Sequence, residues 1–174
     1  MNLKSTLLAT AVCASAGLAL SAGAATSPAT ATFQVLMTIQ KSCSVTAGAA
    51  SNINLGTVDA GAAVGTNGSS SINVTCSKTT PYKIGLQSTN NASTAGLGTM
   101  KGAIVGNTDT LTYQLNSNTQ TGPVWGNVQG TNTVNGTGNG AAQPYTVWAT
   151  VTAAAPTLVT PDSYSDTVTV NVYF

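Results

Sequence analysis

The chain has very few charged side chains. Only 5% of its 174 residues are charged, against roughly 25% in an average soluble protein. The five basic residues are all lysine and the four acidic residues are all aspartate, so arginine, glutamate and histidine are absent. The chain therefore lacks the usual proton relay near neutral pH, the planar fork that binds phosphate or carboxylate, and the basic excess that binds nucleic acid. This composition disfavours catalysis, and we expect no enzyme, no cofactor and no nucleic-acid partner.

Residues 1–24 are typical of a secretory signal peptide. Lys4 gives a positive start, residues 7–20 form a short apolar core, and residues 21–25 supply the small side chains of a cleavage site. We predict cleavage after Ala24, with cleavage after Ala25 as the alternative. The apolar core is shorter than the roughly 18 residues that a transmembrane helix requires. We therefore expect an exported protein without a membrane anchor.

Two cysteines remain after this cleavage, Cys43 and Cys76, because Cys13 lies in the signal segment. An exported protein meets an oxidising compartment, and two cysteines allow one intramolecular pairing. Closing such a loop stabilises a fold by roughly 3–4 kcal/mol in the chain-entropy model. The alternative is a pair of free buried thiols. Two thiolates without histidine make a poor ligand set, so no metal is expected.

Thr, Ser, Asn and Gly separate the apolar residues of the mature chain, and in several segments the two kinds alternate. The alternating apolar sets are Ile72, Val74 and Cys76; Tyr82, Ile84 and Leu86; Leu111, Tyr113 and Leu115; and Tyr145, Val147, Ala149 and Val151. A period of two with one apolar face is typical of antiparallel strands. These strands predict a single all-β domain, a sandwich of about seven short strands.

Turn formers and polar stretches punctuate these strands. Asn67-Gly68, Asn135-Gly136 and Asn139-Gly140 predict tight turns. Residues 90–98 and 126–140 are rich in Gly, Asn and Thr, and we expect them to be long surface loops.

Both ends of the mature chain also alternate. The first segment presents Phe33, Val35, Met37 and Ile39 on one face, and the last presents Val168, Val170, Val172 and Phe174. Most domains let their final residues fray, so this pattern indicates that the end itself is used. The first segment resumes the same parity after Lys41, at Cys43 and Val45. One of its two apolar patches can serve the core of this domain, and the other the core of a different one.

Taken in order, these segments resemble the spore coat protein U family, which includes subunits of archaic, Csu-type chaperone–usher pili. The resemblance is carried by residues 41–45, 53–58, 72–76, 81–86, 111–115, 124–126 and 163–173. It spans essentially the whole mature chain. A glycine would be expected in the turn where Pro161-Asp162-Ser163 stands.

The resemblance implies an incomplete immunoglobulin-like β-sandwich that is completed by a donor strand from another chain. A periplasmic chaperone lends a strand first, and at the outer-membrane usher the N-terminal segment of the next copy replaces it. Residues 25–40 would be this donor segment and residues 41–174 the pilin domain. The implied donor side chains are Phe33, Val35, Met37 and Ile39. The implied acceptor groove and chaperone-recognised strand carry Val168, Val170, Val172 and Phe174, and a Cys43–Cys76 disulfide ties the first strand to the core.

The implied function is that of a structural subunit of a cell-surface fibre, which forms a head-to-tail polymer and supports adhesion and biofilm formation. A tip adhesin is a further candidate partner. Two alternatives remain open: a non-polymerising secreted spore-coat or matrix protein, and a carbohydrate-binding adhesin. The second would use Trp125, Trp148 and Tyr145 as a sugar-stacking platform. The aspartates are scattered, which disfavours a carboxylate pair for glycoside hydrolysis.

Overall fold

The computed structural model describes residues 27–59, 66–153 and 159–174. Residues 39–174 belong to one compact unit, and residues 27–38 lie outside it, so the two parts are described separately. The predicted signal peptide and its cleavage site fall outside the described residues.

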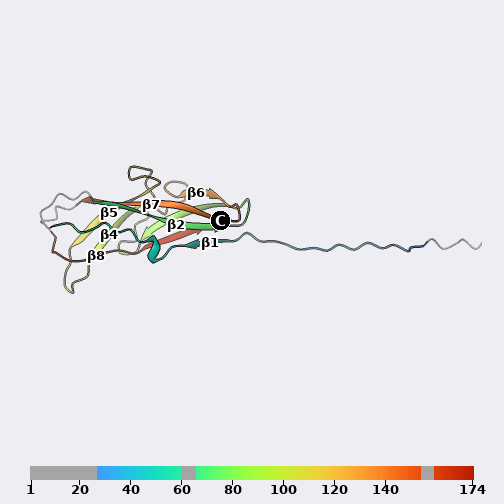
Figure 1. The fold of residues 1–174 in the computed structure, drawn as a ribbon, viewed down its shortest axis with the longest axis horizontal. Coiled ribbons are helices and arrows are strands. Elements are labelled where there is room, and N and C mark those ends of the chain that lie inside the picture. Colours follow the sequence, from blue (N-terminus) through green and yellow to red (C-terminus); the bar gives the residue numbers. More distant parts are fainter. Residues whose placement is uncertain (1–26, 60–65, 154–158) are drawn as a thin grey trace, which may run out of the picture. The chain divides into compact units, whose positions relative to one another are not determined.

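The described residues form nine strands and one short 3-10 helix, with every strand pair antiparallel. The 3-10 helix, η1, spans Ala49–Ser51. The strands are β1 Cys43–Thr46, β2 Asn67–Cys76, β3 Pro81–Ser88, β4 Leu97–Gly102, β5 Thr110–Ser117, β6 Val134–Thr137, β7 Ala142–Ala153, β8 Tyr164–Ser165 and β9 Val168–Tyr173. They form a six-stranded sheet in the order β1-β2-β7-β5-β4-β8 and a three-stranded sheet in the order β6-β3-β9 (Figure 1).

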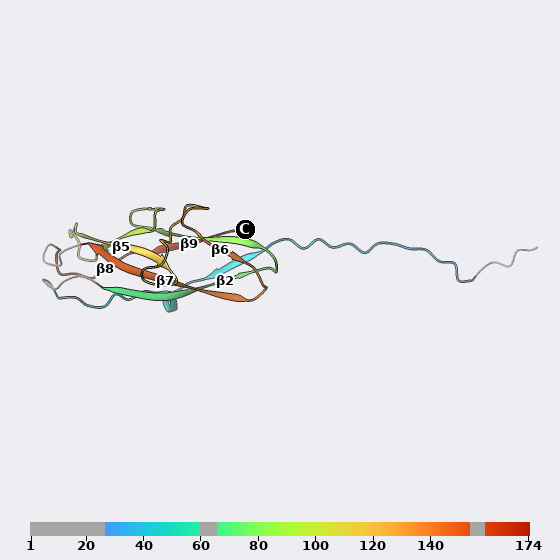
Figure 2. The ribbon, with the colours of Figure 1, turned by 90° about the horizontal axis from the view of Figure 1, so that it is seen from above.

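The core lies between these two sheets and is built from the predicted apolar faces. Val74 and Ile84 are fully buried, and Leu86 and Leu115 are nearly so. Figure 2 shows β2 and β7 on one side of the sandwich and β9 and β6 on the other. The alternation in the sequence therefore predicted most of the core correctly, with the exception of Leu111, which is half-buried and lies outside the core cluster.

Two of the three predicted turns are wrong, because their glycines serve close packing within strands. Asn67-Gly68 opens β2, where a Cβ on Gly68 would lie 2.9 Å from the backbone oxygen of Asn54. Asn135-Gly136 lies in β6, where a Cβ on Gly136 would meet the ring of Tyr82. Asn139-Gly140 does form a connection, with Gly140 at φ 83°. The expected loops at 90–98 and 126–140 are interrupted by the start of β4 and by β6.

The strands run between two ends of the sandwich, which we name the disulfide end and the far end. The disulfide end holds the Cys43–Cys76 bridge, the β2–β3 turn at 77–80 and the last residues of β9. The far end holds the end of β3, the start of β9 and the β4–β5 loop at 103–109. Figure 1 places the C-terminus beside β1 at the disulfide end.

Candidate functional site: an open seam between the sheets

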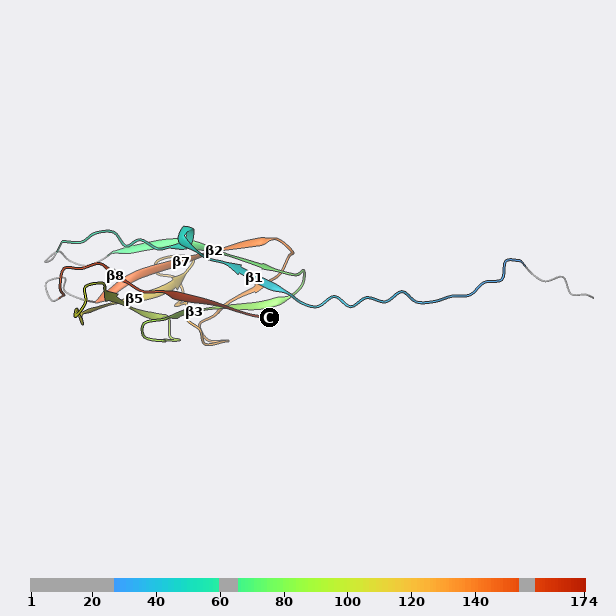
Figure 3. The same ribbon diagram turned by 90° about the horizontal axis from the view of Figure 1, so that it is seen from below.

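The edge of the small sheet formed by β9 is unpaired. One side of β9 pairs with β3 from Ser88↔Val168 to Lys83↔Tyr173, and no strand in the described part of the chain pairs with its other side. β1 lies close to that free side but belongs to the edge of the other sheet. Figure 3 shows β9 between β3 and β1. The sandwich is therefore open along a seam between β9 and β1.

The seam has an apolar floor. Val168, Val170 and Val172 are half-buried and pack against the core, whereas Phe174 is 57% exposed. On the opposite side, Ile53 belongs to the segment that follows β1 and also packs against the core. The structure thus brings the predicted β9 valines together on one face, beneath an edge whose backbone groups have no strand partner.

A cavity of about 490 Å³ lies at the far end of this seam. Leu55 and Val58, from the segment after β1, line one part of it, and Val159 and Tyr164, from the segment before β9, line another. No local sequence pattern predicts this cavity, because its lining comes from segments that are distant along the chain.

The predicted donor side chains are exposed and take no strand structure. Phe33, Val35, Met37 and Ile39 are 88%, 86%, 81% and 80% exposed, and Leu36 between them is 82% exposed. Five large apolar side chains within seven residues make a surface that water solvates poorly.

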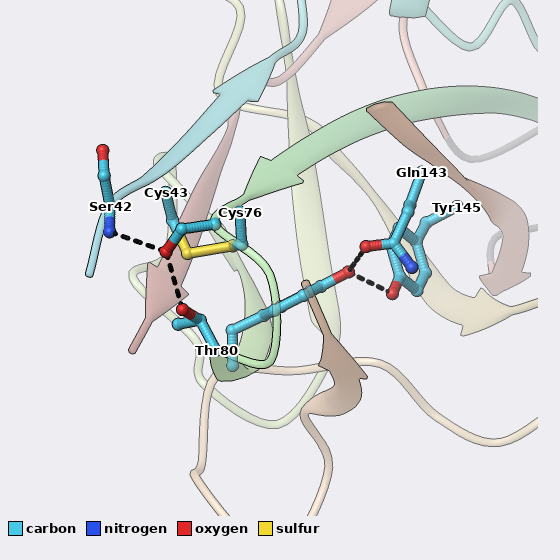
Figure 4. The surroundings of a disulfide bond; sticks show 8 residues. Ser42, Cys43, Cys76, Thr80, Gln143 and Tyr145 are labelled. Carbon is cyan, nitrogen blue, oxygen red and sulfur yellow. Dashed lines mark hydrogen bonds between the residues drawn. A yellow bond between two sulfur atoms is a disulfide. The ribbon is translucent and has the colours of Figure 1, made fainter. Parts of the chain in front are cut away.

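The predicted disulfide is present and anchors the start of β1. Cys43 and Cys76 are directly opposed in the β1–β2 ladder and are bonded, with Cα atoms 4.1 Å apart. Next to the bridge, the Ser77 amide donates to the Ser42 carbonyl at 2.9 Å. The Ser42 amide donates to Ser77 Oγ at 3.2 Å, as Figure 4 shows. The point where the N-terminal segment joins the domain is therefore fixed by one covalent bond and two hydrogen bonds.

A tyrosine pair, with Tyr82 buried and Tyr145 half-buried, supports the same end of the core. The hydroxyl groups of Tyr82 and Tyr145 are hydrogen-bonded at 2.6 Å, and Tyr82 also donates to Gln143 Oε1 at 3.0 Å (Figure 4). Burial, followed by the hydrogen bond to Tyr145, raises the pKa of Tyr82. The pair fills the interior beside the disulfide with its polar groups satisfied.

Asp166 organises the start of β9, a role that sequence reasoning missed. Its carboxylate accepts hydrogen bonds from the Ser88 hydroxyl, from the Tyr113 hydroxyl at 2.7 Å, and from the amides of Asn90 at 3.1 Å and Thr167 at 2.7 Å. Burial, and then the adjacent Asp166 carboxylate, raise the pKa of Tyr113. The strand that borders the seam is therefore fastened to the core where it begins.

Two further aspartates tie together the loops of the far end. Asp162 Oδ2 accepts from the Ile104 amide at 2.9 Å and from Asn107 Nδ2 at 2.8 Å. Asp109 Oδ2 accepts from the amide and hydroxyl of Thr160 at 2.8 and 2.6 Å. These bonds lower the pKa of both carboxyl groups, chiefly through the Ile104 amide for Asp162 and the Thr160 hydroxyl for Asp109. The Asp162 side chain thus braces the turn in which the sequence lacks the expected glycine.

The sugar-stacking platform considered from the sequence is wrong for Trp125. This side chain is fully buried, donates from Nε1 to the Ile84 carbonyl at 2.8 Å, and packs edge-on against Tyr145. The indole of Trp148 instead donates to the Asn118 carbonyl at 3.1 Å. Trp125 is a core residue and offers no face to a ligand.

Within the described ranges, no three His, Cys, Asp or Glu side chains are grouped so that they could hold a metal ion. No helix among the same residues is long and apolar enough to cross a membrane.

The two sheets and the seam define an all-β, immunoglobulin-like sandwich that is open along one edge, as predicted. The chain belongs to the Spore Coat Protein U domain family, whose model matches residues 29–171. No curated protein matched the chain.

Two solved structures are similar to this chain, and the first shares its fold. One is the CsuC–CsuE chaperone–tip adhesion subunit pre-assembly complex from archaic chaperone–usher Csu pili of Acinetobacter baumannii, with 21% identity and a TM-score of 0.54. The match covers 79% of this chain and 41% of that one. The other is a chaperone–tip adhesin complex of CFA/I fimbriae biogenesis, with 14% identity, a TM-score of 0.47, and coverage of 75% and 40%. This chain therefore spans about two fifths of the length of the solved chains that it matches.

Proposed function

We propose that this protein is a structural, non-enzymatic subunit of a chaperone–usher fibre that polymerises by donor-strand complementation. The segment Phe33–Ile39 of one copy fills the seam between β9 and β1 of the next. The observation that carries the proposal is the unpaired edge of β9 above its half-buried valines. Membership of the Spore Coat Protein U domain family supports it.

Insertion of this segment would pair the free backbone groups of the seam and cover its apolar side chains. Its backbone supplies hydrogen-bond partners to the free edge of β9, as in β-augmentation. Its alternate side chains cover the apolar floor, and each fully buried one contributes roughly 1.5–3 kcal/mol before ordering costs are subtracted. Many contacts must be lost together before a copy leaves, so dissociation is slow.

The alternation favours one register. All strand pairs among the described residues are antiparallel, and we assign the same direction to the donor. Opposed residues of an antiparallel pair share a face, and the best match sets Phe33 opposite Phe174, Val35 opposite Val172, Met37 opposite Val170, and Ile39 opposite Val168. A shift by two residues in one direction would bury Lys41 opposite Val168. A shift in the other direction would set Ile39 against Asp166.

The partners follow from the same exposed seam. An unpaired apolar edge aggregates unless it is covered, so a periplasmic chaperone covers it before assembly and an outer-membrane usher exchanges that cover for the next copy. The protein then passes through the periplasm into a surface fimbrium that supports adhesion and biofilm formation. A tip adhesin ends the fibre.

The test compares two charge substitutions on adjacent residues of the donor segment. Val35→Asp places a carboxylate on the face that enters the seam, whereas Gln34→Asp places the same charge on the face directed to solvent. We expect Gln34→Asp to retain polymer that runs as a ladder on gels unless the sample is boiled, and Val35→Asp to lose it. Undiminished polymer from Val35→Asp would refute the proposal. A compact monomer with residues 33–39 protected in its own seam would indicate the non-polymerising alternative.

A further inference from the structure

The few charges of this chain are sorted between the two ends of the sandwich. All four carboxylate side chains gather toward the far end. Asp109 and Asp162 bind its loops, Asp166 holds the start of β9, and Asp59 follows the cavity-lining residue Val58. One lysine, Lys101, shares this end, since β4 pairs it with Ser165 of β8. The far end is therefore net negative.

The disulfide end carries the opposite sign. Lys78 is exposed in the β2–β3 turn directly after Ser77, and Lys41 is exposed directly before Ser42, which is hydrogen-bonded to Ser77. Lys83 lies nearby, opposite Tyr173 in the β3–β9 ladder. Lys41, Lys78 and Lys83 thus give this end a net positive charge.

The two ends are too far apart to neutralise each other within one copy. β7 has 12 residues and runs from the partner of Thr75 to the partner of Thr112, a span of about 40 Å at the usual rise per residue. The Debye length at physiological salt is about 8 Å. Each end therefore presents its own field to an approaching molecule.

We infer that the positive disulfide end of one copy docks against the negative far end of the next, and that this charge complementarity steers and orients head-to-tail assembly. The inference rests on the proposed function, because the antiparallel register places Ile39 at the far end of the acceptor. Only Gln40 and Lys41 then separate Ile39 from Ser42, which is fixed at the disulfide end of the incoming copy. The three Cα–Cα steps from Ile39 to Ser42 span about 10 Å at most, so the two ends meet within about one Debye length of each other.

This arrangement gives the charged residues a role in rate and polarity. Oriented fields raise association rates by about ten-fold or more, and the effect falls steeply with ionic strength. A copy approaching in the reverse orientation brings two ends of the same sign together. Asp109 and Asp162 remain ionised at neutral pH, because the hydrogen bonds that hold their loops also lower the pKa of each carboxyl group.

The experiment follows polymer growth after the full mature chain is unfolded in urea and refolded by dilution. Growth of the boiling-sensitive ladder is measured at about 10 mM salt, where the Debye length is about 30 Å, and at about 1 M, where it is about 3 Å. We expect the wild type to assemble on the order of ten-fold faster at low salt. Lys78→Gln should weaken this difference, because it removes one of the lysines that make the disulfide end positive. Lys101→Gln removes the same charge from the opposite end and should keep the difference or increase it.

A charge reversal tests whether the sign of the disulfide end matters. Lys78→Asp should slow assembly at low salt further than Lys78→Gln does, because it lowers the net positive charge of that end by two instead of one. Equal rates of polymer growth for the wild type and all variants at both salt concentrations would overturn the inference but would still agree with donor-strand polymerisation. A wild-type chain that forms no ladder at either concentration would overturn both.

Discussion

The Cys43–Cys76 bridge should carry a large share of the stability of the domain. It joins residues 33 positions apart, and the chain-entropy relation for a loop of that length gives about 4 kcal/mol at room temperature. At the usual entropy of unfolding per residue, a unit the size of residues 39–174 converts this into a fall in melting temperature of about 13 °C. The bridge also fastens β1, so its loss loosens one border of the seam as well as the fold.

The assay is thermal unfolding of assembled protein followed by circular dichroism. We expect Cys43→Ser combined with Cys76→Ser to melt about 13 °C lower than the wild type, and reductant to lower the wild type by a similar amount. Reductant added to the double variant is the control and should change nothing. A double variant that melts within about 3 °C of the wild type would refute the reasoning, because it would mean that the bridge adds little constraint to the unfolded chain.

Two further predictions concern the aspartates. Asp166→Asn should lower the free energy of unfolding by about 2 kcal/mol, because it removes the charge from hydrogen bonds donated by Ser88 and Tyr113. Thr167→Ala, which changes an exposed neighbour, should lower the free energy of unfolding far less. Equal effects of the two substitutions in urea titrations would contradict the role of Asp166. Acid should also destabilise the far end: the lowered pKa values of Asp109 and Asp162 provide stability that is complete above the unfolded value of 3.8 and disappears as pH falls through the folded values. The melting temperature of the wild type should therefore stay constant from neutral pH down to about pH 4 and then fall. The melting temperature of Asp162→Asn should fall less over the same range.

The sequence predicted the core well because the immediate neighbours of a core residue indicate which face of the strand it occupies. Ile84 or Leu115 alternates with polar neighbours, and this pattern suffices to assign its face. The turns were predicted less well because some glycines are required by contacts with distant residues. Asn135-Gly136 predicts a turn from its local sequence, yet a glycine is required at position 136 because the ring of Tyr82, more than fifty positions away in the chain, lies against it. Contacts between distant segments leave no trace in a local pattern.

The candidate site likewise has features that local sequence patterns predicted and features that they did not. The alternation of Val168, Val170 and Val172 predicted a final strand, and the family resemblance implied that this strand borders an open groove. The cysteine count predicted the bridge that anchors β1. The role of Asp166 was hidden, because its donors Ser88, Asn90 and Tyr113 come from three separate places in the sequence. The sorting of charge was hidden too, since Lys41 and Lys78 become neighbours only when Ser42 pairs with Ser77.

Because the chain has few charged residues and they lie at the two ends of the sandwich, its electric field is concentrated at those ends. Asp109 and Asp162 brace loops at the far end, and the same carboxylates give that end its sign. A side surface made mainly of neutral Thr, Ser, Asn and Gly exerts no comparable field, so electrostatic guidance acts along the long axis of the sandwich and hardly at all across it. A subunit of this design gains end-to-end steering from a handful of charged residues, and adding charge along its sides would weaken that directional preference.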